Sequence, residues 1–155
     1  MSRALALVLL GLLCACGSGP EAQLEKAQKL LASGDYAGAA AAASEGLAAG
    51  AEGPAAWRLE LAALEGEARS GKTADVVARL ERLAGPWSAQ LTGALYVQTA
   101  GQLKEGGDPA GAIGVLDVGV RRYPGDVDIT RAIEQLKTTG SDAELERLRS
   151  LGYVE

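Results

Sequence analysis

The sequence predicts an all-α fold made of antiparallel helix pairs, and three observations support this prediction. The chain of 155 residues is 48% hydrophobic but only 4% aromatic, and alanine, the strongest helix former, dominates it. Apolar residues recur every three or four positions in successive segments, which is typical of helices buried on one side. Gly34, Gly71 and Gly107 interrupt these segments at intervals of 37 and 36 residues. Length and regular spacing together indicate a single repetitive domain.

The amino terminus has the layout of a signal peptide. Arg3 provides a short positive start, residues 4–13 are apolar, and Cys14 and Cys16 follow. The apolar run is well short of the ~20 residues that a membrane-spanning helix needs. Two alternatives stay open at this point, namely an ordinary secretory signal cut near Ala15 and a disulfide between the two cysteines.

The segment Leu13-Cys14-Ala15-Cys16 resembles the lipobox of bacterial lipoproteins. In that family a leucine stands three residues before the lipidated cysteine and a small residue stands directly before it. Cys16 fits this arrangement, whereas Cys14 would follow the bulky Leu13. The resemblance implies that residues 1–15 are removed and that Cys16 carries acyl chains such as palmitate, and two or more chains give stable membrane anchoring.

Gly17 follows the cysteine, where Asp favours retention at the inner membrane of Gram-negative cells. The lipoprotein resemblance therefore implies an outer-membrane location facing the periplasm. Residues 16–20 are expected to form the lipidated terminus and a short tether without helical pattern. A repeat domain with its capping helix is then expected over residues 21–137, and a short last helix with a tail over residues 138–155.

The first predicted helix pair lies on either side of Gly34 and Asp35. Residues 21–33 place Leu24, Ala27, Leu30 and Leu31 on one side of a helix, and charged residues on the other. The second helix starts at Tyr36, and its inner side consists mainly of alanine. This pair is expected to have a core of small side chains.

The second predicted pair consists of a helix after Pro54, which suits a first turn, and a helix over residues 73–84. Glu60 and Glu67 stand where the next pair has Tyr96 and Leu103. Two explanations are open. Either the first helix is rotated so that Leu61, Leu64 and Ala68 face inward, or the turn before Gly71 differs by one residue.

The third predicted pair, within residues 96–124, has the clearest boundaries. Gly106 and Gly107 break the helical pattern, and Asp108 with Pro109 suits the start of a new helix. The whole stretch resembles a tetratricopeptide repeat, a pattern of large and small residues at fixed spacing. The matching residues are Tyr96, Ala100, Leu103, Ala112, Leu116 and Pro124. The resemblance implies a short right-handed α-solenoid of about three helix pairs.

Two further helices are predicted after the third pair. Residues 126–137 place Ile129, Ile133 and Leu136 on one side, and such a helix would cap the array. Residues 138–140 are expected to be a break. Ser141 and Glu144 then form a capping-box signature before a short last helix.

The composition argues against several functions. The chain contains no His, which excludes histidine-based acid–base catalysis, and its net charge of -5 disfavours nucleic acid as a partner. Gly107, Gly111 and Gly114 lack the Lys-Ser/Thr pair of a phosphate loop. Glu65 and Glu67 are expected on a solvated helix face rather than as an acid–base pair. We therefore expect no enzyme, cofactor, metal site, catalytic residue or small-molecule substrate.

The tetratricopeptide resemblance implies instead a concave groove lined by the first helix of each pair, which receives a peptide. The corresponding residues are Leu24, Gln28, Leu31, Arg58, Leu61, Glu65, Arg69, Val97 and Lys104. For each of them a plain surface or core position is an open alternative. The chain has no Asn, so the carboxylate clamp of some chaperone-binding members is not expected in its usual form.

Three functions follow from these expectations. The first is an outer-membrane lipoprotein that holds a protein or peptide partner of the cell envelope in its groove, as a scaffold or assembly factor. The second is a structural accessory subunit that packs through its helix edges. The third, least supported, is an envelope enzyme or one of its subunits.

Overall fold

The structure is a computed structural model that describes residues 19–155. Within this range the chain forms eight α-helices and no strand, which confirms the predicted all-α class. The helices are α1 (Pro20–Ser33), α2 (Tyr36–Ala48), α3 (Gly53–Arg69), α4 (Thr73–Leu83), α5 (Gly93–Glu105), α6 (Pro109–Arg122), α7 (Val127–Thr139) and α8 (Asp142–Ser150). The predicted signal peptide and Cys16 lie outside the described residues.

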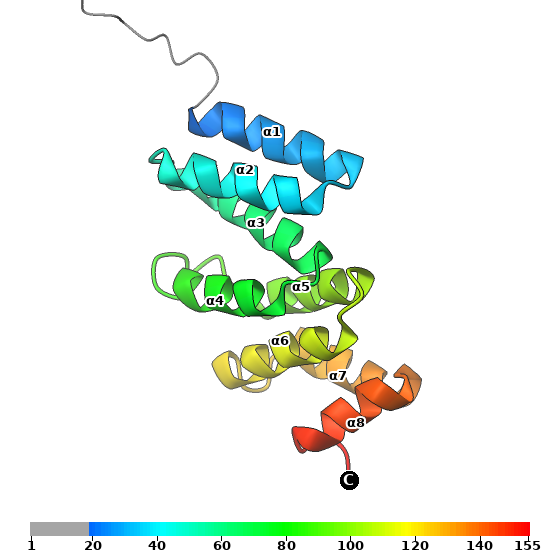
Figure 1. Cartoon of the computed structure of the whole chain (residues 1–155). Coiled ribbons are helices and arrows are strands. Elements are labelled where there is room, and N and C mark those ends of the chain that lie inside the picture. Colours follow the sequence, from blue (N-terminus) through cyan, green and yellow to red (C-terminus); the bar gives the residue numbers. More distant parts are fainter. Residues whose placement is uncertain (1–18) are drawn as a thin grey trace, which may run out of the picture.

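The helices stack into an elongated array with α1 at one end and α8 at the other (Figure 1). Helices α1, α3, α5 and α7 each contact the next one in this series, and they form one layer. Helices α2, α4 and α6 lie in front of α3, α5 and α7 in this view (Figure 1). The first helices of successive pairs therefore share one side of the molecule.

The turns within the first three pairs have the same geometry. Gly34, Gly71 and Gly107 all have positive φ, at 83°, 67° and 87°, a conformation that glycine adopts without steric cost. In each turn the next residue's N–H donates to the carbonyl five positions earlier, at 2.9, 3.0 and 2.9 Å. The turn before Gly71 is thus the same length as the others, which excludes one of the two explanations for the second pair.

Side chains cap several helices as the sequence predicts. Asp108 accepts a hydrogen bond from the Gly111 N–H at 2.8 Å, and Ser141 forms the predicted capping box with Glu144. Such caps satisfy backbone donors that the first turn leaves free. The predicted break over residues 138–140 is wrong at its start, because α7 continues to Thr139 and only Gly140 is extended.

The core has two parts of different character. The part shared by α1, α2 and α3 contains Leu24 and Leu59 among alanines, so the helices there approach closely. At Gly66 of α3 an added Cβ would lie 2.5 Å from the Tyr36 carbonyl oxygen of α2. The larger part runs from α3 to α8 and contains Tyr96 and other large side chains. The predicted inward residues Ile129 and Ile133 of α7 belong to it.

Candidate functional site

The candidate site is a groove of about 540 Å³ on the side formed by the first helices of the three pairs. Its lining comes from α1, α3, α5 and the connection between α4 and α5. The lining residues are Gln28, Leu31, Trp57, Arg58, Leu61, Ala62, Leu64, Glu65, Gln90, Thr92, Ala94, Leu95, Gln98 and Gln102. Five of the nine residues implied by the resemblance are among them, namely Gln28, Leu31, Arg58, Leu61 and Glu65.

The connection between α4 and α5 shapes one end of the groove. Leu91 is 3% exposed and anchors this connection in the core, and Thr92 caps α5 by accepting from the Leu95 N–H at 3.4 Å. Trp87 packs against Trp57 of α3, with ring centroids 5.3 Å apart. Such aromatic pairs hold each other in place, so the indole of Trp57 borders the groove in a defined position.

The groove carries little net charge. Glu65 accepts a hydrogen bond at 2.9 Å from Arg69, whose guanidinium also donates to Glu105 at 2.5 Å. The hydrogen bond that Arg69 donates to Glu65 is the main cause that raises the pKa of Arg69 above its usual value. Among the described residues, no carboxylate forms an ion pair with Arg58. Arg58 is therefore the one uncompensated charge in the lining.

The other four predicted groove residues lie elsewhere. The prediction for Leu24 is wrong, because this side chain is 2% exposed and belongs to the core between α1, α2 and α3. Arg69 lies beside the groove, where it pairs with carboxylates and stacks over Tyr36 at 5.5 Å. Val97 and Lys104 line a separate, smaller hollow of about 260 Å³ between α5, α6, α7 and the start of α8.

Lys104 has a defined partner in that second hollow. Its ammonium lies 2.7 Å from Glu144, whose other oxygen accepts from the Ser141 N–H at 2.8 Å. The Lys104 ammonium, together with the Ser141 N–H, lowers the pKa of Glu144 to about 2. This arrangement ties α8 to α5 and leaves Lys104 committed to a structural contact.

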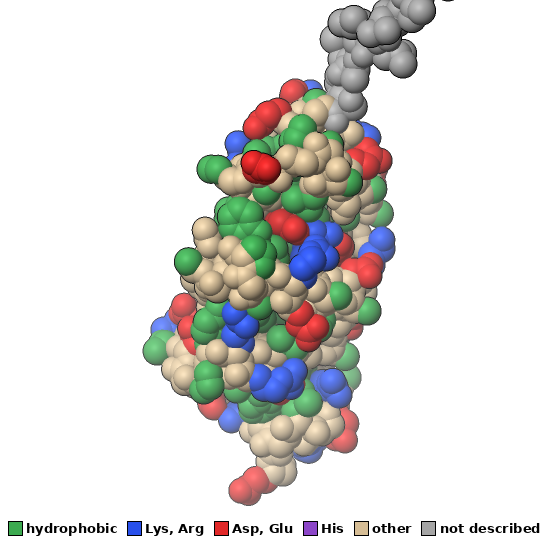
Figure 2. Space-filling view, turned by 90° about the vertical axis from the view of Figure 1, so that its left-hand side faces the viewer, with side chains coloured by type: hydrophobic (Ala, Val, Ile, Leu, Met, Phe, Trp, Pro, Cys, Tyr) green, Lys and Arg blue, Asp and Glu red, His purple; other side chains and the backbone are tan. Residues whose placement is uncertain are grey.

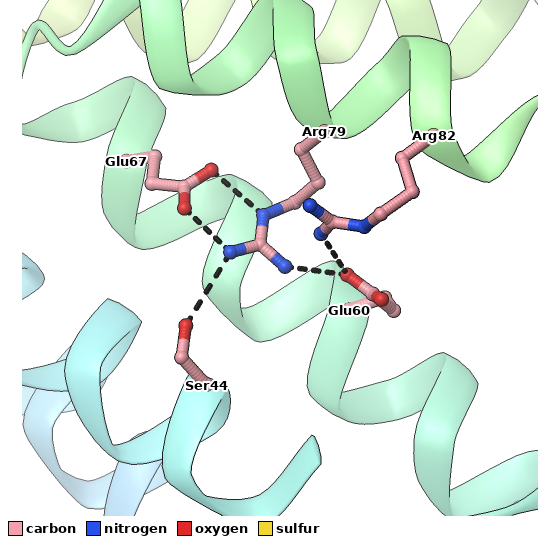
Figure 3. A network of polar contacts seen from close by, with 5 residues as sticks. All are labelled: Ser44, Glu60, Glu67, Arg79 and Arg82. Atoms are coloured by element: carbon pink, nitrogen blue, oxygen red, sulfur yellow. Dashed lines mark hydrogen bonds and ion pairs between the residues drawn. The ribbon is translucent and has the colours of Figure 1, made fainter. Parts of the chain in front are cut away.

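A second cluster of charged residues lies buried between α2, α3 and α4 (Figure 3). Arg79 donates two hydrogen bonds to Glu67, at 2.8 and 2.5 Å, and one to Glu60 at 2.5 Å. Arg82 reaches Glu60 at 3.4 Å from the outside. The expectation that Glu67 is solvated is therefore wrong, because it is 8% exposed and paired with a buried guanidinium.

The buried cluster also tests the remaining explanation for the second helix pair, namely that its first helix is rotated. Glu60 and Glu67 take the inward positions that Tyr96 and Leu103 take in α5, so helix α3 is not rotated. Of the three residues expected inward on a rotated helix, Leu64 and Ala68 are buried, whereas Leu61 lines the groove. Burial alone would lower the pKa of Arg79, but the hydrogen bonds and charges of Glu67 and Glu60 more than offset it, so the pKa is raised. Two cations then balance two carboxylates, as buried charges require.

The sequence reasoning missed the glutamines of the groove. Gln90, Gln98 and Gln102 come from the α4–α5 connection and from α5, and none was expected at the site. The available signal was the spacing of Gln98 and Gln102, which lie four residues apart and so on one side of a helix. Spacing alone does not show which helix this side of α5 faces, because that depends on where α1 and α3 lie.

Three further features of the described residues concern charge, metal ligands and membrane spans. On the face seen in Figure 2, basic and acidic side chains are interspersed without an extended patch of one sign. Within residues 19–155, no three His, Cys, Asp or Glu side chains come together as metal ligands. No helix in that range is long and apolar enough to cross a membrane.

Comparisons with known proteins give no relative for this chain. No protein-family model matches it, and neither curated proteins nor solved structures yield a match.

Proposed function

We propose that the protein binds a protein partner of the bacterial cell envelope in the groove between α1, α3 and α5. In this role it is a scaffold or assembly factor rather than an enzyme. The observation that carries the proposal is the groove itself, because three successive first helices contribute to one hollow of about 540 Å³. Grooves with apolar walls and a few polar groups are typical binding sites.

The fold proposed for this role is a short right-handed α-solenoid of the tetratricopeptide type. It is supported by three turns of the same hydrogen-bond pattern, at Gly34, Gly71 and Gly107. Spacings of 37 and 36 residues lie close to the 34 residues of that family. Solenoids of this kind use the concave side of their first helices for binding.

The proposed location is the outer membrane, with the chain anchored through lipid on Cys16. The support is the Leu13-to-Cys16 segment, which resembles a lipobox. The measurement is fractionation of cells that produce the wild type or Cys16→Ala. The wild type is expected in the membrane fraction and the variant in the soluble fraction. Unchanged membrane association of the variant would contradict the lipid anchor.

The binding proposal is tested by site-specific photocrosslinking of the full-length protein in its native cells. A photoreactive residue at Ala94, an exposed alanine of the groove lining, is expected to capture a partner for identification by mass spectrometry. The matched control is Ala110, an exposed alanine on α6 in the other layer. A partner that crosslinks only through Ala110 would indicate packing through helix edges, and would contradict the groove.

Two substitutions that change the charge of the groove give a second test of the same proposal. Arg58→Glu changes the one uncompensated charge of the groove, and Leu61→Asp places a carboxylate on its apolar wall. Both are expected to abolish the crosslink through Ala94. Lys72→Glu makes the same charge change at the exposed start of α4 and is expected to leave it intact.

A further inference from the structure

The second hollow, between α5, α6, α7 and the start of α8, lies at the end of the array away from α1 (Figure 1). It shares no lining residue with the groove. Its floor consists of apolar side chains that are at most 6% exposed, namely Ala100, Ala112, Ile113 and Leu116. The second hollow is therefore a separate apolar surface, of the kind that favours an apolar ligand.

Small residues leave this hollow open. At Gly101 of α5, which lines it, an added Cβ would meet nothing within 4 Å. At Gly119 of α6, outside the lining, an added Cβ would lie 2.9 Å from the Ile129 side chain. The free space is thus local to the hollow. An apolar cavity of about 150 Å³ holds benzene, so the volume of about 260 Å³ admits an aromatic ring or a chain of about six carbons.

A buried carboxylate oxygen borders the hollow without a hydrogen bond. Glu144 is 5% exposed, and its Oε2 accepts from the Ser141 N–H and hydroxyl, both at 2.8 Å. Its Oε1 accepts no hydrogen bond from residues 19–155. The Lys104 ammonium lies 2.7 Å from this oxygen as an ion pair, outside the angular range of a hydrogen bond. A buried acceptor of this kind costs free energy unless water or a ligand supplies the donor.

The charges at this end of the hollow select an uncharged polar group. Glu144 keeps its charge at neutral pH, since its pKa is about 2, so it offers only acceptors, whereas Lys104 offers only donors. A ligand carboxylate would be repelled by Glu144 and a ligand ammonium by Lys104. A hydroxyl or a primary amide both donates and accepts, and therefore matches both members of the ion pair.

We propose that the second hollow binds a small uncharged amphiphile, that is, an apolar molecule with one hydroxyl or primary amide group. This group donates to Oε1 of Glu144 and accepts from the Lys104 ammonium. The apolar part packs on Ile113 and Leu116 and fills the space beside Gly101. The site does not depend on the groove or on the protein partner proposed for it.

The test is methyl NMR of the full-length protein in lipid nanodiscs, because a detergent is itself an amphiphile. The chain contains three isoleucines. Ile113 lines the hollow, whereas Ile129 and Ile133 are buried outside its lining. Their δ1-methyl signals are followed during titration with 1-hexanol, hexanamide, hexanoate or hexylammonium. Ligand concentrations are corrected for partitioning into empty nanodiscs.

The two uncharged compounds, 1-hexanol and hexanamide, are expected to shift the Ile113 signal saturably. Their affinities should exceed those of hexanoate and hexylammonium about 10-fold, as expected for hydrogen bonds to charged groups. Glu144→Gln removes the charge that repels a carboxylate, and it should raise the affinity of hexanoate relative to that of 1-hexanol.

Gly101→Leu fills the hollow and is expected to abolish the shift of Ile113. The matched control is Gly114→Leu, at a glycine of α6 outside the lining where an added Cβ also meets nothing within 4 Å. This control should leave the affinity unchanged. An Ile129 signal at its wild-type position shows that each variant is folded, and Glu144→Gln tests the polar end independently of Gly101→Leu.

Three outcomes overturn the inference. If no compound shifts Ile113 saturably, the hollow holds water only. A shift that persists in Gly101→Leu would mean that the compound binds elsewhere. Equal or tighter binding of hexanoate or hexylammonium would contradict the recognition of an uncharged group by the ion pair. None of these outcomes changes the proposal for the groove, which crosslinking through Ala94 tests separately.

Discussion

The pair α3–α4 and the pair α5–α6 occupy the same kind of position in the array, yet they are held together by different chemistry. Positions 36 residues apart correspond, so that Glu60, Glu67 and Arg79 stand where the later pair has Tyr96, Leu103 and Val115. All six residues are buried. One pair therefore has a charged interior and the other an apolar one, on the same frame of turns.

The difference shows what each kind of interior does. Helices α5 and α6 approach each other closely along their length, whereas α3 and α4 do so much less. The long side chain of Arg79 bridges the wider gap, and it also reaches Ser44 of α2 at 3.4 Å. Apolar contacts tolerate several arrangements, but a forked guanidinium requires its partners at fixed angles. The buried cluster is thus suited to fix the orientation of α4 relative to α2 and α3.

The largest expected effect comes from removing the cation. Arg79→Ala leaves Glu60 and Glu67 buried without a partner, which is expected to lower the free energy of unfolding by about 3–5 kcal/mol. The corresponding apolar truncation, Val115→Ala, is expected to cost about 2 kcal/mol. Urea denaturation at pH 7 measures both. If Arg79→Ala lowered the free energy of unfolding by less than Val115→Ala does, water would have to reach the two carboxylates. The contrast between a charged and an apolar interior would then be contradicted.

The second experiment converts one interior into the other. Combining Glu60→Tyr, Glu67→Leu and Arg79→Val gives α3–α4 the residues of α5–α6. Buried ion clusters are often replaced by apolar residues at little cost, so we expect stability within about 2 kcal/mol of the wild type and well above that of Arg79→Ala. Arg82 loses its partner, but it is 57% exposed and solvent hydrates it. Urea denaturation measures the stability of the triple variant. A triple variant less stable than Arg79→Ala would contradict the conclusion that positions 36 residues apart correspond in the two pairs.

A third contrast concerns glycines within helices. An added Cβ at Gly66 would lie 2.5 Å from the Tyr36 carbonyl oxygen and 2.9 Å from the Ala40 nitrogen, whereas at Gly101 of α5 nothing lies within 4 Å. Gly66→Ala must separate α2 from α3, and its expected cost is about 1–3 kcal/mol. Gly101→Ala is expected to stabilise by about 0.5–1 kcal/mol, because alanine favours helix. Equal changes in melting temperature for the two variants would contradict the close approach of α2 and α3.

These comparisons also show what the sequence reveals and what it does not. Helices, glycine turns and the caps at Asp108 and Ser141 were predictable, because their signals lie within a few residues of the structure they cause. The burial of Glu67 was not, since it depends on Arg79, 12 positions away on another helix. A pattern of two glutamates seven residues apart, on one helix side with buried leucines, was the available hint.

The groove also contains some residues that the sequence reasoning expected and others that it missed. Arg58 and Leu61 of α3, which the tetratricopeptide resemblance implied for a groove, do line this hollow. Leu24 was misplaced because α2 and α3 cover it in the core. Gln98 and Gln102 were missed because the position of α5 relative to α3 depends on the connection anchored by Leu91. Tertiary placement of whole helices is therefore the information that local patterns lack.

The smallest effect is expected for the ion pair between Lys104 and Glu144, which, unlike the buried cluster, is open to water on one side. The Lys104 side chain is 53% exposed, whereas Glu144 is only 5% exposed, and the pKa of Glu144 is lowered to about 2. In the unfolded chain a glutamate titrates near pH ~4.3. Because the folded pKa is the lower one, the pair stabilises the protein fully above pH ~4.3, and this contribution is lost as the pH falls toward about 2.

The expected size of this contribution is about 1–2 kcal/mol, less than the pKa shift alone implies, because solvent screens the exposed ammonium. Glu144→Gln keeps the size of the side chain and removes the charge, so its unfolding free energy should fall less than that of the wild type between pH 5 and pH 2.5. The two proteins differ at this residue alone, so the difference between their pH profiles reports this one pair. Added salt should reduce the difference at pH 5, since it reaches Lys104, while leaving the cost of Arg79→Ala nearly unchanged. Parallel pH profiles for the two proteins would show that α8 is held by Leu148 and its apolar neighbours alone.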